Sequence, residues 1–399
     1  MFLKTRILAP AAFIAILSGC AAGTAPPGAL TREAATVVDA DEIVALAPGP
    51  AGADRLAAEA DRLGYVVERR EALAALDRQL LTLRLPAGTD PLAAISALER
   101  AAPGSVAGRN HAYRHGPEDI SAAGSGRDYA DALLDWPAGG CPATVPVGII
   151  DTPLDPGAAS DWTVAYRDFT GGAPADPHGA AVAELIAGPG RLRGARLHHA
   201  AVVGTVPGQA PAAGVDDIVR ALDWLASEDV RLVNVSLAGP YNKILDRGLA
   251  AASERGMVIV AAAGNDGRDA PPRWPAASPG VIAVTAVDAD LAPYRGAPRG
   301  TWLDFAAPGV DVYVPLAGGG RYLSGTSIAA AFVTALAASE PDGLGGGAAA
   351  MRARLALGSR DLGEPGPDEV FGAGLPATDP GCRGGVVGAP AGDGGVAAG

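Results

Sequence analysis

In the C-terminal part of the chain, buried-strand patterns alternate with amphipathic helical patterns, and this alternation limits the possible folds more than any other feature. Residues 145–150 form an apolar run typical of a buried strand. Apolar residues in 218–225 recur at helical spacing before the strand pattern of 231–235, and 245–252 repeats this arrangement before 257–262. Strands that alternate with helices favour a parallel sheet with helices on both faces. We therefore expect an α/β fold.

Three reactive side chains stand at the ends of these predicted elements. Asp151 terminates an apolar strand, and open α/β sheets build their sites at the carboxyl ends of strands. His178 precedes a helix of small residues, while Ser327 stands at the N-terminus of a helix that runs on to residue 338. At that helix end the dipole and the free backbone N–H groups favour developing negative charge. Taken singly, each residue also fits an ordinary role: a turn residue, a structural histidine and an N-cap.

Together the three segments resemble the subtilase family of serine peptidases. The family motifs are Asp-Thr/Ser-Gly, His-Gly-Thr-His-Val-Ala and Gly-Thr-Ser-Met-Ala-Ala-Pro, and the order Asp, His, Ser is that of subtilisin. An α/β-hydrolase would need a different order and a Gly-x-Ser-x-Gly elbow. Further family segments follow at residues 235–240 (VSLAGP), 261–267 (AAAGNDG), 274–276 (WPA), 281–284 (VIAV), 305–309 (FAAPG) and 371–375 (FGAGL). The resemblance covers 145–376 and implies a subtilisin-like, doubly covered, mostly parallel sheet.

The resemblance also implies a serine endopeptidase that acts on polypeptide substrates. Ser327 would attack the scissile carbonyl carbon, His178 would take its proton and return it to the leaving amine, and Asp151 would fix the imidazole tautomer. The Asn265 side-chain amide and the Ser327 backbone N–H would hold the oxyanion. The residues implied for substrate binding are Ser236, Leu237, Ala238, Gly239 and Gly264. We expect no cofactor and no metal site, because no dense Asp/Asn loop matches a family calcium site.

Two departures from the family pattern bear on the site. Pro153 replaces the usual Gly after Asp-Thr and fixes φ near −65°, which puts the geometry of Asp151 in question. Ala238 replaces a Gly and adds a methyl group at the rim of the pocket for the residue before the scissile bond. Because 236–239 and 261–264 contain no charge, we expect that pocket to favour small or medium apolar residues over Arg or Lys.

Upstream, residues 39–115 predict a small α+β unit with a βαββαβ order, the ferredoxin-like pattern. Its last predicted strand is 105–114. A unit of this kind directly before a subtilase domain resembles the family's inhibitory propeptide, which implies an intramolecular inhibitor. His111 and His115 are expected to be surface residues, and the neighbours His198 and His199 should point in opposite directions on a strand.

The N-terminus resembles a bacterial lipoprotein signal. Residues 1–19 combine two basic residues with an apolar run too short to span a bilayer, and Leu-Ser-Gly precedes Cys20. The resemblance implies export, lipidation of Cys20 and a membrane anchor, with residues 20–38 as a tether. An ordinary signal peptide with a chance cysteine is the alternative. By resemblance to Gram-negative lipoproteins, Ala21 after Cys20 implies the outer membrane, facing the periplasm, as the destination.

Export into an oxidising compartment leaves Cys141 and Cys382 as a natural disulfide pair. We expect a linker over 116–140, a catalytic domain over 141–382 and a disordered tail over 383–399. The linker is polar and glycine-rich, so we expect self-processing there, which would release the catalytic domain unless the two parts stay bound.

Charge and composition exclude nucleic acid as a main partner, and the motifs leave two alternative functions open. The formal net charge is −13 and no basic stripe occurs, which argues against nucleic-acid binding. A transpeptidase or narrow processing enzyme would share the same motifs. A catalytically silent scaffold that binds peptides or a partner protein is the alternative from another class, although peptide binding alone would not require the full set of Asp151, His178, Asn265 and Ser327.

Overall fold

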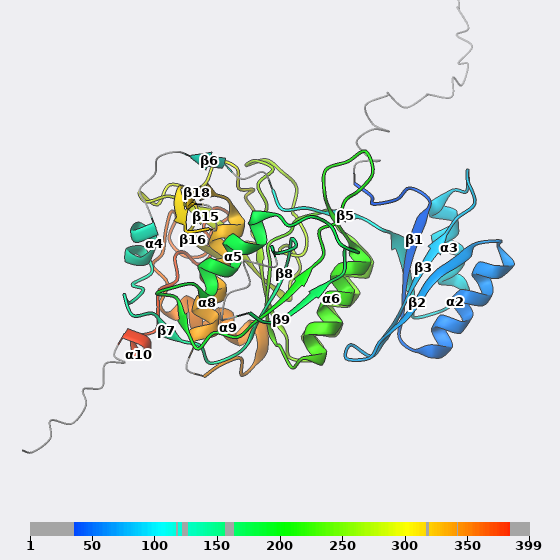
Figure 1. Ribbon diagram of the computed structural model, residues 1–399, viewed down its shortest axis with the longest axis horizontal. Coiled ribbons are helices and arrows are strands. Elements are labelled where there is room, and N and C mark those ends of the chain that lie inside the picture. Colours follow the sequence, from blue (N-terminus) through cyan, green and yellow to red (C-terminus); the bar gives the residue numbers. More distant parts are fainter. Residues whose placement is uncertain are drawn as a thin grey trace, which may run out of the picture.

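The computed structural model consists of two units packed side by side (Figure 1). The N-terminal unit is 36–116 and the C-terminal unit is 119–383. The structure describes residues 36–116, 119–121, 127–155, 163–316, 319–340 and 342–383. The expected signal peptide, Cys20, most of the tether and the tail after residue 383 lie outside these residues. Within the described part of the chain, none of the helices is long and apolar enough to cross a membrane.

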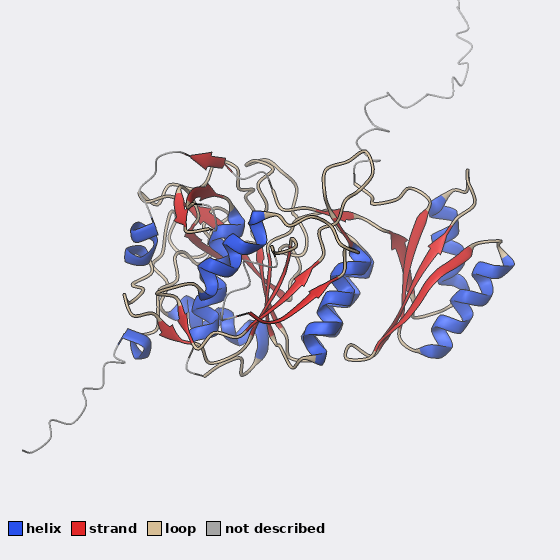
Figure 2. Ribbon diagram, viewed as in Figure 1, coloured by secondary structure: helices blue, strands red, loops and turns tan. Residues whose placement is uncertain are grey.

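The N-terminal unit has the expected βαββαβ order. Its elements are β1 (Glu42–Ala47), α2 (Pro50–Arg62), β2 (Val66–Leu73), β3 (Arg78–Arg84), α3 (Pro91–Ala101) and β4 (Val106–Arg109). The antiparallel sheet has the strand order β2-β3-β1-β4, and both helices cover one of its faces (Figure 2). This is the ferredoxin-like arrangement.

The two faces of that sheet bury different partners. Ile43 and Leu83 pack with the unit's own helices, whereas Val44, Leu46 and Leu80 join the apolar core of the C-terminal unit. Side chains alternate across a strand, so each strand supplies both cores. The N-terminal unit therefore docks in part through apolar side chains of β1 and β3.

The prediction of one continuous fourth strand over 105–114 is wrong, because the strand divides at Asn110. β4 pairs with β1 in the N-terminal sheet, and β5 (Ala112–Tyr113) pairs instead with β12 (Ala213–Gly214) of the C-terminal unit. The Asn110 side chain explains the break, since its Oδ1 accepts from the Val215 N–H and its Nδ2 donates to Glu42 and Asp216. The chain thus crosses from one unit to the other at this residue.

The C-terminal unit is built on a seven-stranded sheet in which every pairing is parallel, as the alternation predicts. Its order is β16-β15-β14-β13-β8-β11-β9. The strands are β8 (Val147–Asp151), β9 (Thr163–Asp168), β11 (Leu197–Ala201), β13 (Leu232–Val235), β14 (Val258–Ala262), β15 (Val281–Val287) and β16 (Phe305–Pro308).

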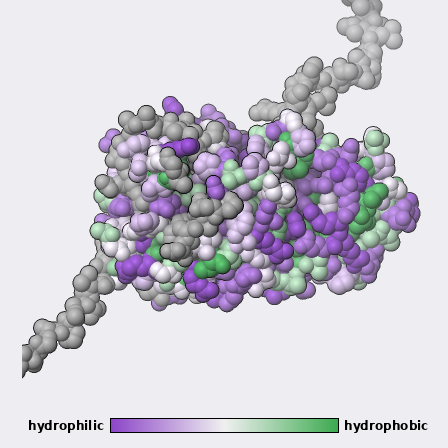
Figure 3. Space-filling model, in the orientation of Figure 1, coloured by the Kyte–Doolittle hydropathy of each residue, from purple (hydrophilic) through white to green (hydrophobic). Residues whose placement is uncertain are grey.

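Helices cover both faces of this sheet. α5 (Pro177–Ala187) and α8 (Thr326–Ser339) pack on one face, and α6 (Val215–Ser227) and α7 (Lys243–Glu254) pack on the other. The N-terminal unit lies against α6 and α7. The smaller elements are β6 (Asp119–Ser121), α4 (Arg127–Leu133), β7 (Cys141–Pro142), β10 (Leu192–Arg193), β17 (Val312–Val314), β18 (Arg321–Ser324), α9 (Gly347–Leu357) and α10 (Pro380–Arg383). On the face drawn in Figure 3, the surface is largely hydrophilic with scattered apolar residues.

Part of the expected linker is folded into the C-terminal unit. Ala130 and Leu134 are fully buried in its core, and Trp136 is nearly so. The guanidinium of the buried Arg191 lies 5.5 Å from the Trp136 ring centroid and pairs with Asp131. The expectation of a linker over all of 116–140 is therefore wrong for 127–140, and β6 also pairs with β18 of the same unit.

A disulfide joins two distant segments of the C-terminal unit. Cys141 in β7 and Cys382 in α10 are bonded, with Cα atoms 5.4 Å apart. Both cysteines are buried. The bond fixes α10, the last helix described, against β7.

Candidate active site

Asp151 and His178 are in direct contact at the carboxyl edge of the large sheet. Asp151 is the last residue of β8, and His178 lies in the first turn of α5, whose N-cap residue Asp176 accepts from the His178 backbone N–H. The His178 Nδ1 and Asp151 Oδ1 atoms are 2.6 Å apart, and both side chains are buried. The prediction that His178 precedes its helix is off by two residues, since α5 begins at Pro177.

The contact fixes the proton positions. Burial alone raises the pKa of Asp151, but the charge and hydrogen bond of His178 and the Thr152 N–H outweigh it, so the pKa lies below its ordinary value. An ionised carboxylate only accepts hydrogen bonds, so the proton of a neutral His178 ring is on Nδ1 and Nε2 is the acceptor nitrogen. A base in this state can receive a proton at Nε2.

Thr152 and His199 hold this pair in place, and neither was predicted to belong to the site. The Thr152 N–H donates to Asp151 Oδ1 at 2.7 Å, and its Oγ1 accepts from the Gly179 N–H at 2.9 Å. The His199 Nε2–H donates to the Thr152 carbonyl at 2.8 Å. A side chain on Gly179 would place Cβ 2.8 Å from that carbonyl, so only glycine fits beside His178. Pro153, questioned above, leaves the Asp151–His178 contact intact.

Ser327 lies in the first turn of α8, next to the substrate strand implied by the sequence. The helix has Gly325 as its N-cap without a side-chain cap, so neither Thr326 nor Ser327 serves as one. Ser327 is buried, and its Oγ donates to the Ser236 carbonyl at 3.4 Å. The N-terminal dipole of this 14-residue helix favours negative charge at this position.

The side-chain amide of Asn265 has a fixed orientation. Its Oδ1 accepts from both the N–H and the Oγ1–H of Thr326, each at 3.0 Å. Thr326 Oγ1 in turn accepts from the Gly264 N–H at 3.0 Å. Because the oxygen is committed to Thr326, the amide presents its Nδ2 donor toward Gly116, whose Cβ position would be 2.7 Å away.

The end of the N-terminal unit enters this site as an extended strand, which we call the cleft strand (residues 112–116). The Arg114 N–H donates to the Ala238 carbonyl at 3.0 Å, and the Ala238 N–H donates to the Arg114 carbonyl at 2.8 Å. On the other side Tyr113 pairs with Ala213 of β12. The cleft strand is thus held between two backbone edges of the C-terminal unit.

The cleft strand brings His115 onto His178. Their ring centroids are 4.5 Å apart, with 26° between the planes. The next residue, Gly116, lies against Asn265, as described above. The expectation that His111 and His115 are surface residues is wrong: both are half-buried, and the Asn242 Nδ2 lies 3.0 Å from the His111 Nδ1.

Tyr113 anchors the other end of the cleft strand. It is fully buried, its hydroxyl donates to the Pro240 carbonyl at 2.8 Å, and its ring lies over Gly239. A Cβ on Gly239 would be 2.4 Å from the Tyr113 ring, so this edge accepts the aromatic ring only because residue 239 is glycine.

A small pocket lies beside Gly116. Its volume is about 220 Å³, and its lining includes Gly116, Ala238, Asn265, Asp266 and Arg273. Asp266 and Arg273 form an ion pair of 2.7 Å. The expectation of uncharged pocket walls is therefore wrong.

The substrate residues implied by the sequence do not all reach the pocket. Ala238 and Gly239 border it, and Gly264 adopts φ +105° with Arg273 close to it. The Leu237 side chain is buried in the core instead. Ser236 contributes the carbonyl that accepts from Ser327.

The remaining histidines point in different directions. His198 lies near Trp224, whereas the His199 ring stacks on Tyr166. Across the residues that the structure describes, no group of three or more His, Cys, Asp and Glu side chains could hold a metal ion.

Sequence comparison connects this site to known proteins. The model of the subtilase family matches residues 144–374. Subtilisin-like protease 1 of Arthroderma gypseum is 35% identical over 170 residues, which is 40% of this chain and 34% of that protein. Minor extracellular protease Epr of Bacillus subtilis is 27% identical over 265 residues, or 60% of this chain and 39% of that protein. The chain thus spans between a third and two fifths of the length of these curated relatives.

Structural comparison agrees on the fold. Fervidolysin from Fervidobacterium pennivorans, a keratinolytic enzyme related to subtilisin, superposes with a TM-score of 0.67 at 19% sequence identity. The match covers 86% of this chain and 61% of fervidolysin. At this identity the similarity concerns the fold.

Proposed function

The chain belongs to the subtilase family, and from this premise we propose that it is a serine endopeptidase with a Ser327–His178–Asp151 triad. Ser327 Oγ attacks the scissile carbonyl carbon, and His178 Nε2 takes its proton. The same imidazole returns the proton to the leaving amine, and water then releases the acyl group by the reverse transfers. Asp151 keeps the ring in the Nδ1–H tautomer and stabilises the imidazolium.

The oxyanion that forms in this reaction needs fixed donors. The Asn265 amide has its oxygen committed to Thr326, so its Nδ2 donor is aimed before the reaction begins. The Ser327 backbone N–H, at the N-terminus of α8, supplies the second donor. Preorganised donors of this kind stabilise the transition state without reorganisation.

One observation carries the proposal: the proposed base, the proposed oxyanion donor and the substrate edge border the same short stretch of chain. His178 contacts His115, Asn265 faces Gly116, and Ala238 pairs with Arg114. A polypeptide in the cleft therefore meets the base, the oxyanion donor and the substrate edge within three residues.

We propose in addition that the N-terminal unit is an intramolecular inhibitor. Its sheet shares an apolar core with the C-terminal unit, and its cleft strand occupies the place of a substrate. Export, lipidation of Cys20, an outer-membrane location facing the periplasm and self-processing complete the proposal. Because 127–140 packs into the C-terminal unit, the processing region narrows to 116–126.

Peptide hydrolysis by alanine variants tests the activity. Asp151→Ala, His178→Ala and Ser327→Ala should each abolish cleavage of a quenched fluorescent peptide. Asn265→Ala should lower turnover by about 100- to 1,000-fold, which is typical for the loss of one oxyanion donor. Normal turnover by the Ser327→Ala variant would contradict the proposal.

Cell fractionation tests anchoring and processing. Cells expressing the wild type should yield a soluble fragment whose N-terminus lies within 116–126. Ser327→Ala should remain full-length and membrane-bound, and Cys20→Ser should lose the membrane association of the full-length form. Identical full-length protein in the membrane fraction of wild-type and Ser327→Ala cells would contradict self-processing.

A further inference from the structure

The cleft strand lies in a defined register with respect to the reacting groups. Arg114 makes both backbone hydrogen bonds with Ala238, His115 covers His178, and Gly116 meets Asn265. Since Asn265 is the proposed oxyanion donor, the carbonyl that belongs at the reaction centre is that of Gly116. The peptide bond in position for attack is therefore the one that follows Gly116.

The residue after Gly116 in the sequence is Pro117. The nitrogen of this bond is a prolyl nitrogen, which carries the ring carbon Cδ where every other residue carries a hydrogen. Cleavage would form the Ser327 Oγ–carbonyl bond, break the bond from that carbonyl to the nitrogen, and move the Ser327 proton through His178 to the departing nitrogen. A prolyl nitrogen leaves carrying the ring carbon Cδ in addition to Cα, so a proton donor has less room to approach it than the nitrogen of any other residue.

We infer that Pro117 protects the cleft strand from the chain's own active site, so that the N-terminal unit is held as an uncleaved inhibitor. The inference rests on the proposed function and deepens it, because it states which bond the site is presented with and why that bond survives. A tethered strand is present at high effective concentration, and a cleavable bond in the same register would be consumed.

The inference also restricts self-processing. Any cut by the wild-type enzyme has to fall after Pro117, within 118–126. For such a cut, the segment has to enter its own cleft in a different register, or enter the cleft of a second molecule. The segment 122–126 reads Ala-Ala-Gly-Ser-Gly, with small residues that suit the pocket beside Gly116.

Substitution of the single proline tests the inference. Purified full-length wild type, Pro117→Ala and Pro117→Ala/Ser327→Ala are incubated, and the fragments are identified by N-terminal sequencing. Pro117→Ala should generate a fragment that begins at residue 117, at least about 100-fold faster than the wild type, because general acid catalysis is worth that much or more. The rate should be independent of protein concentration, and the double variant should stay intact.

Pro137→Ala is the matched control, since it removes the next proline along the chain without changing the bond after Gly116. It should behave as the wild type. A wild-type fragment that begins at residue 117 would overturn the inference. So would a Pro117→Ala protein that hydrolyses an added peptide yet leaves its own 116–117 bond intact. Absence of peptide hydrolysis by every variant would instead overturn the proposed function, and the inference with it.

Discussion

The imidazole of His115 stacks on the imidazole of His178, with ring centroids 4.5 Å apart, although the two residues belong to different units of the fold. The contact covers the proposed catalytic base with a residue of the chain's own N-terminal unit. Access to the site therefore depends on how firmly the cleft strand is held. Tyr113 is the most deeply buried residue of the cleft strand.

We predict that Tyr113→Ala opens the site. Truncation of a buried aromatic residue costs about 3–5 kcal/mol, which corresponds to an increase of at least about 100-fold in the rate of fluorophosphonate labelling. Tyr113→Phe loses only the hydrogen bond to Pro240, worth about 1 kcal/mol, so labelling should rise about fivefold. Equal rates for the wild type and both variants would show that the cleft strand does not limit access.

The specificity of the pocket beside Gly116 should depend on Arg273. In the wild type Arg273 neutralises Asp266, so we expect small or medium apolar residues before the scissile bond and poor cleavage after Lys or Arg. Arg273→Ala leaves Asp266 unpaired and should raise cleavage after Lys, relative to Ala, by up to about tenfold, because the pair is partly exposed. A peptide-library profile that is identical for both proteins would contradict this assignment.

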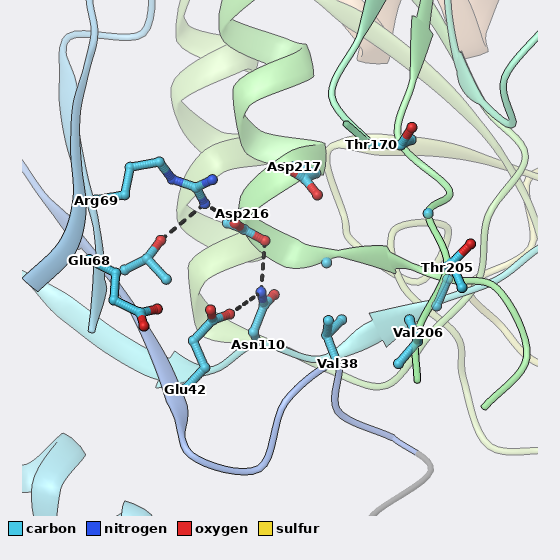
Figure 4. A pocket seen from close by; sticks show the side chains of 14 residues that line it. Val38, Glu42, Glu68, Arg69, Asn110, Thr170, Thr205, Val206, Asp216 and Asp217 are labelled. Atoms are coloured by element: carbon cyan, nitrogen blue, oxygen red, sulfur yellow. Dashed lines mark hydrogen bonds and ion pairs between the residues drawn. The ribbon is translucent and has the colours of Figure 1, made fainter. Parts of the chain in front are cut away.

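The free energy of unfolding should depend on pH through Asp217, which lies between the two units. This residue lines a cavity between the units together with Glu42, Asp216 and Arg69 (Figure 4). Burial and, next, the charge of Asp216 raise the pKa of Asp217 from 3.8 to about 7. The positive charges of Arg220 and Arg69 oppose this shift but do not cancel it. Its contribution to stability is complete below about pH 3.8 and is lost as the pH rises through about 7.

Urea denaturation of the Ser327→Ala protein at pH 5 and pH 8 checks this prediction without self-cleavage. The free energy of unfolding should fall between the two pH values. Adding Asp217→Asn, whose side chain stays neutral, should reduce that fall. An unchanged pH dependence in the Asn variant would assign the effect to other groups.

The disulfide should make a large contribution to stability. The bond closes a loop with a sequence separation of 241, for which chain-entropy arguments give roughly 5 kcal/mol as an upper value. Cys141→Ser/Cys382→Ser, in the Ser327→Ala background, should have a lower urea midpoint that dithiothreitol does not change further. Equal midpoints with and without the bond would contradict the prediction.

The sequence predicted the parts of the site that lie within local motifs. Asp151 follows an apolar strand, and Ser327 opens a helix of small residues, so each position is determined by a few neighbouring residues. The division of 105–114 at Asn110 was not predictable in the same way, because Asn110 bonds to α6 of the other unit. The position of His115 on His178 depends on that same crossing.

Two other features of the structure were also not predicted from the sequence. Asp266 and Arg273 lie just outside the two segments, 236–239 and 261–264, from which the charge of the pocket was judged, so their ion pair was missed. Trp136 was assigned to a linker because its neighbourhood is rich in glycine and alanine. Its burial depends on Arg191, which lies far along the chain.

The most direct test of the account is the location of a fluorophosphonate adduct by mass spectrometry. The probe reacts with a serine only when a neighbouring base activates it. In the Tyr113→Ala protein, where the cleft strand is loosened, we predict a single adduct on Ser327 that is absent from the matching His178→Ala protein. An adduct on another serine, or an unmodified Ser327 in folded Tyr113→Ala protein, would contradict the assignment of Ser327 as the nucleophile.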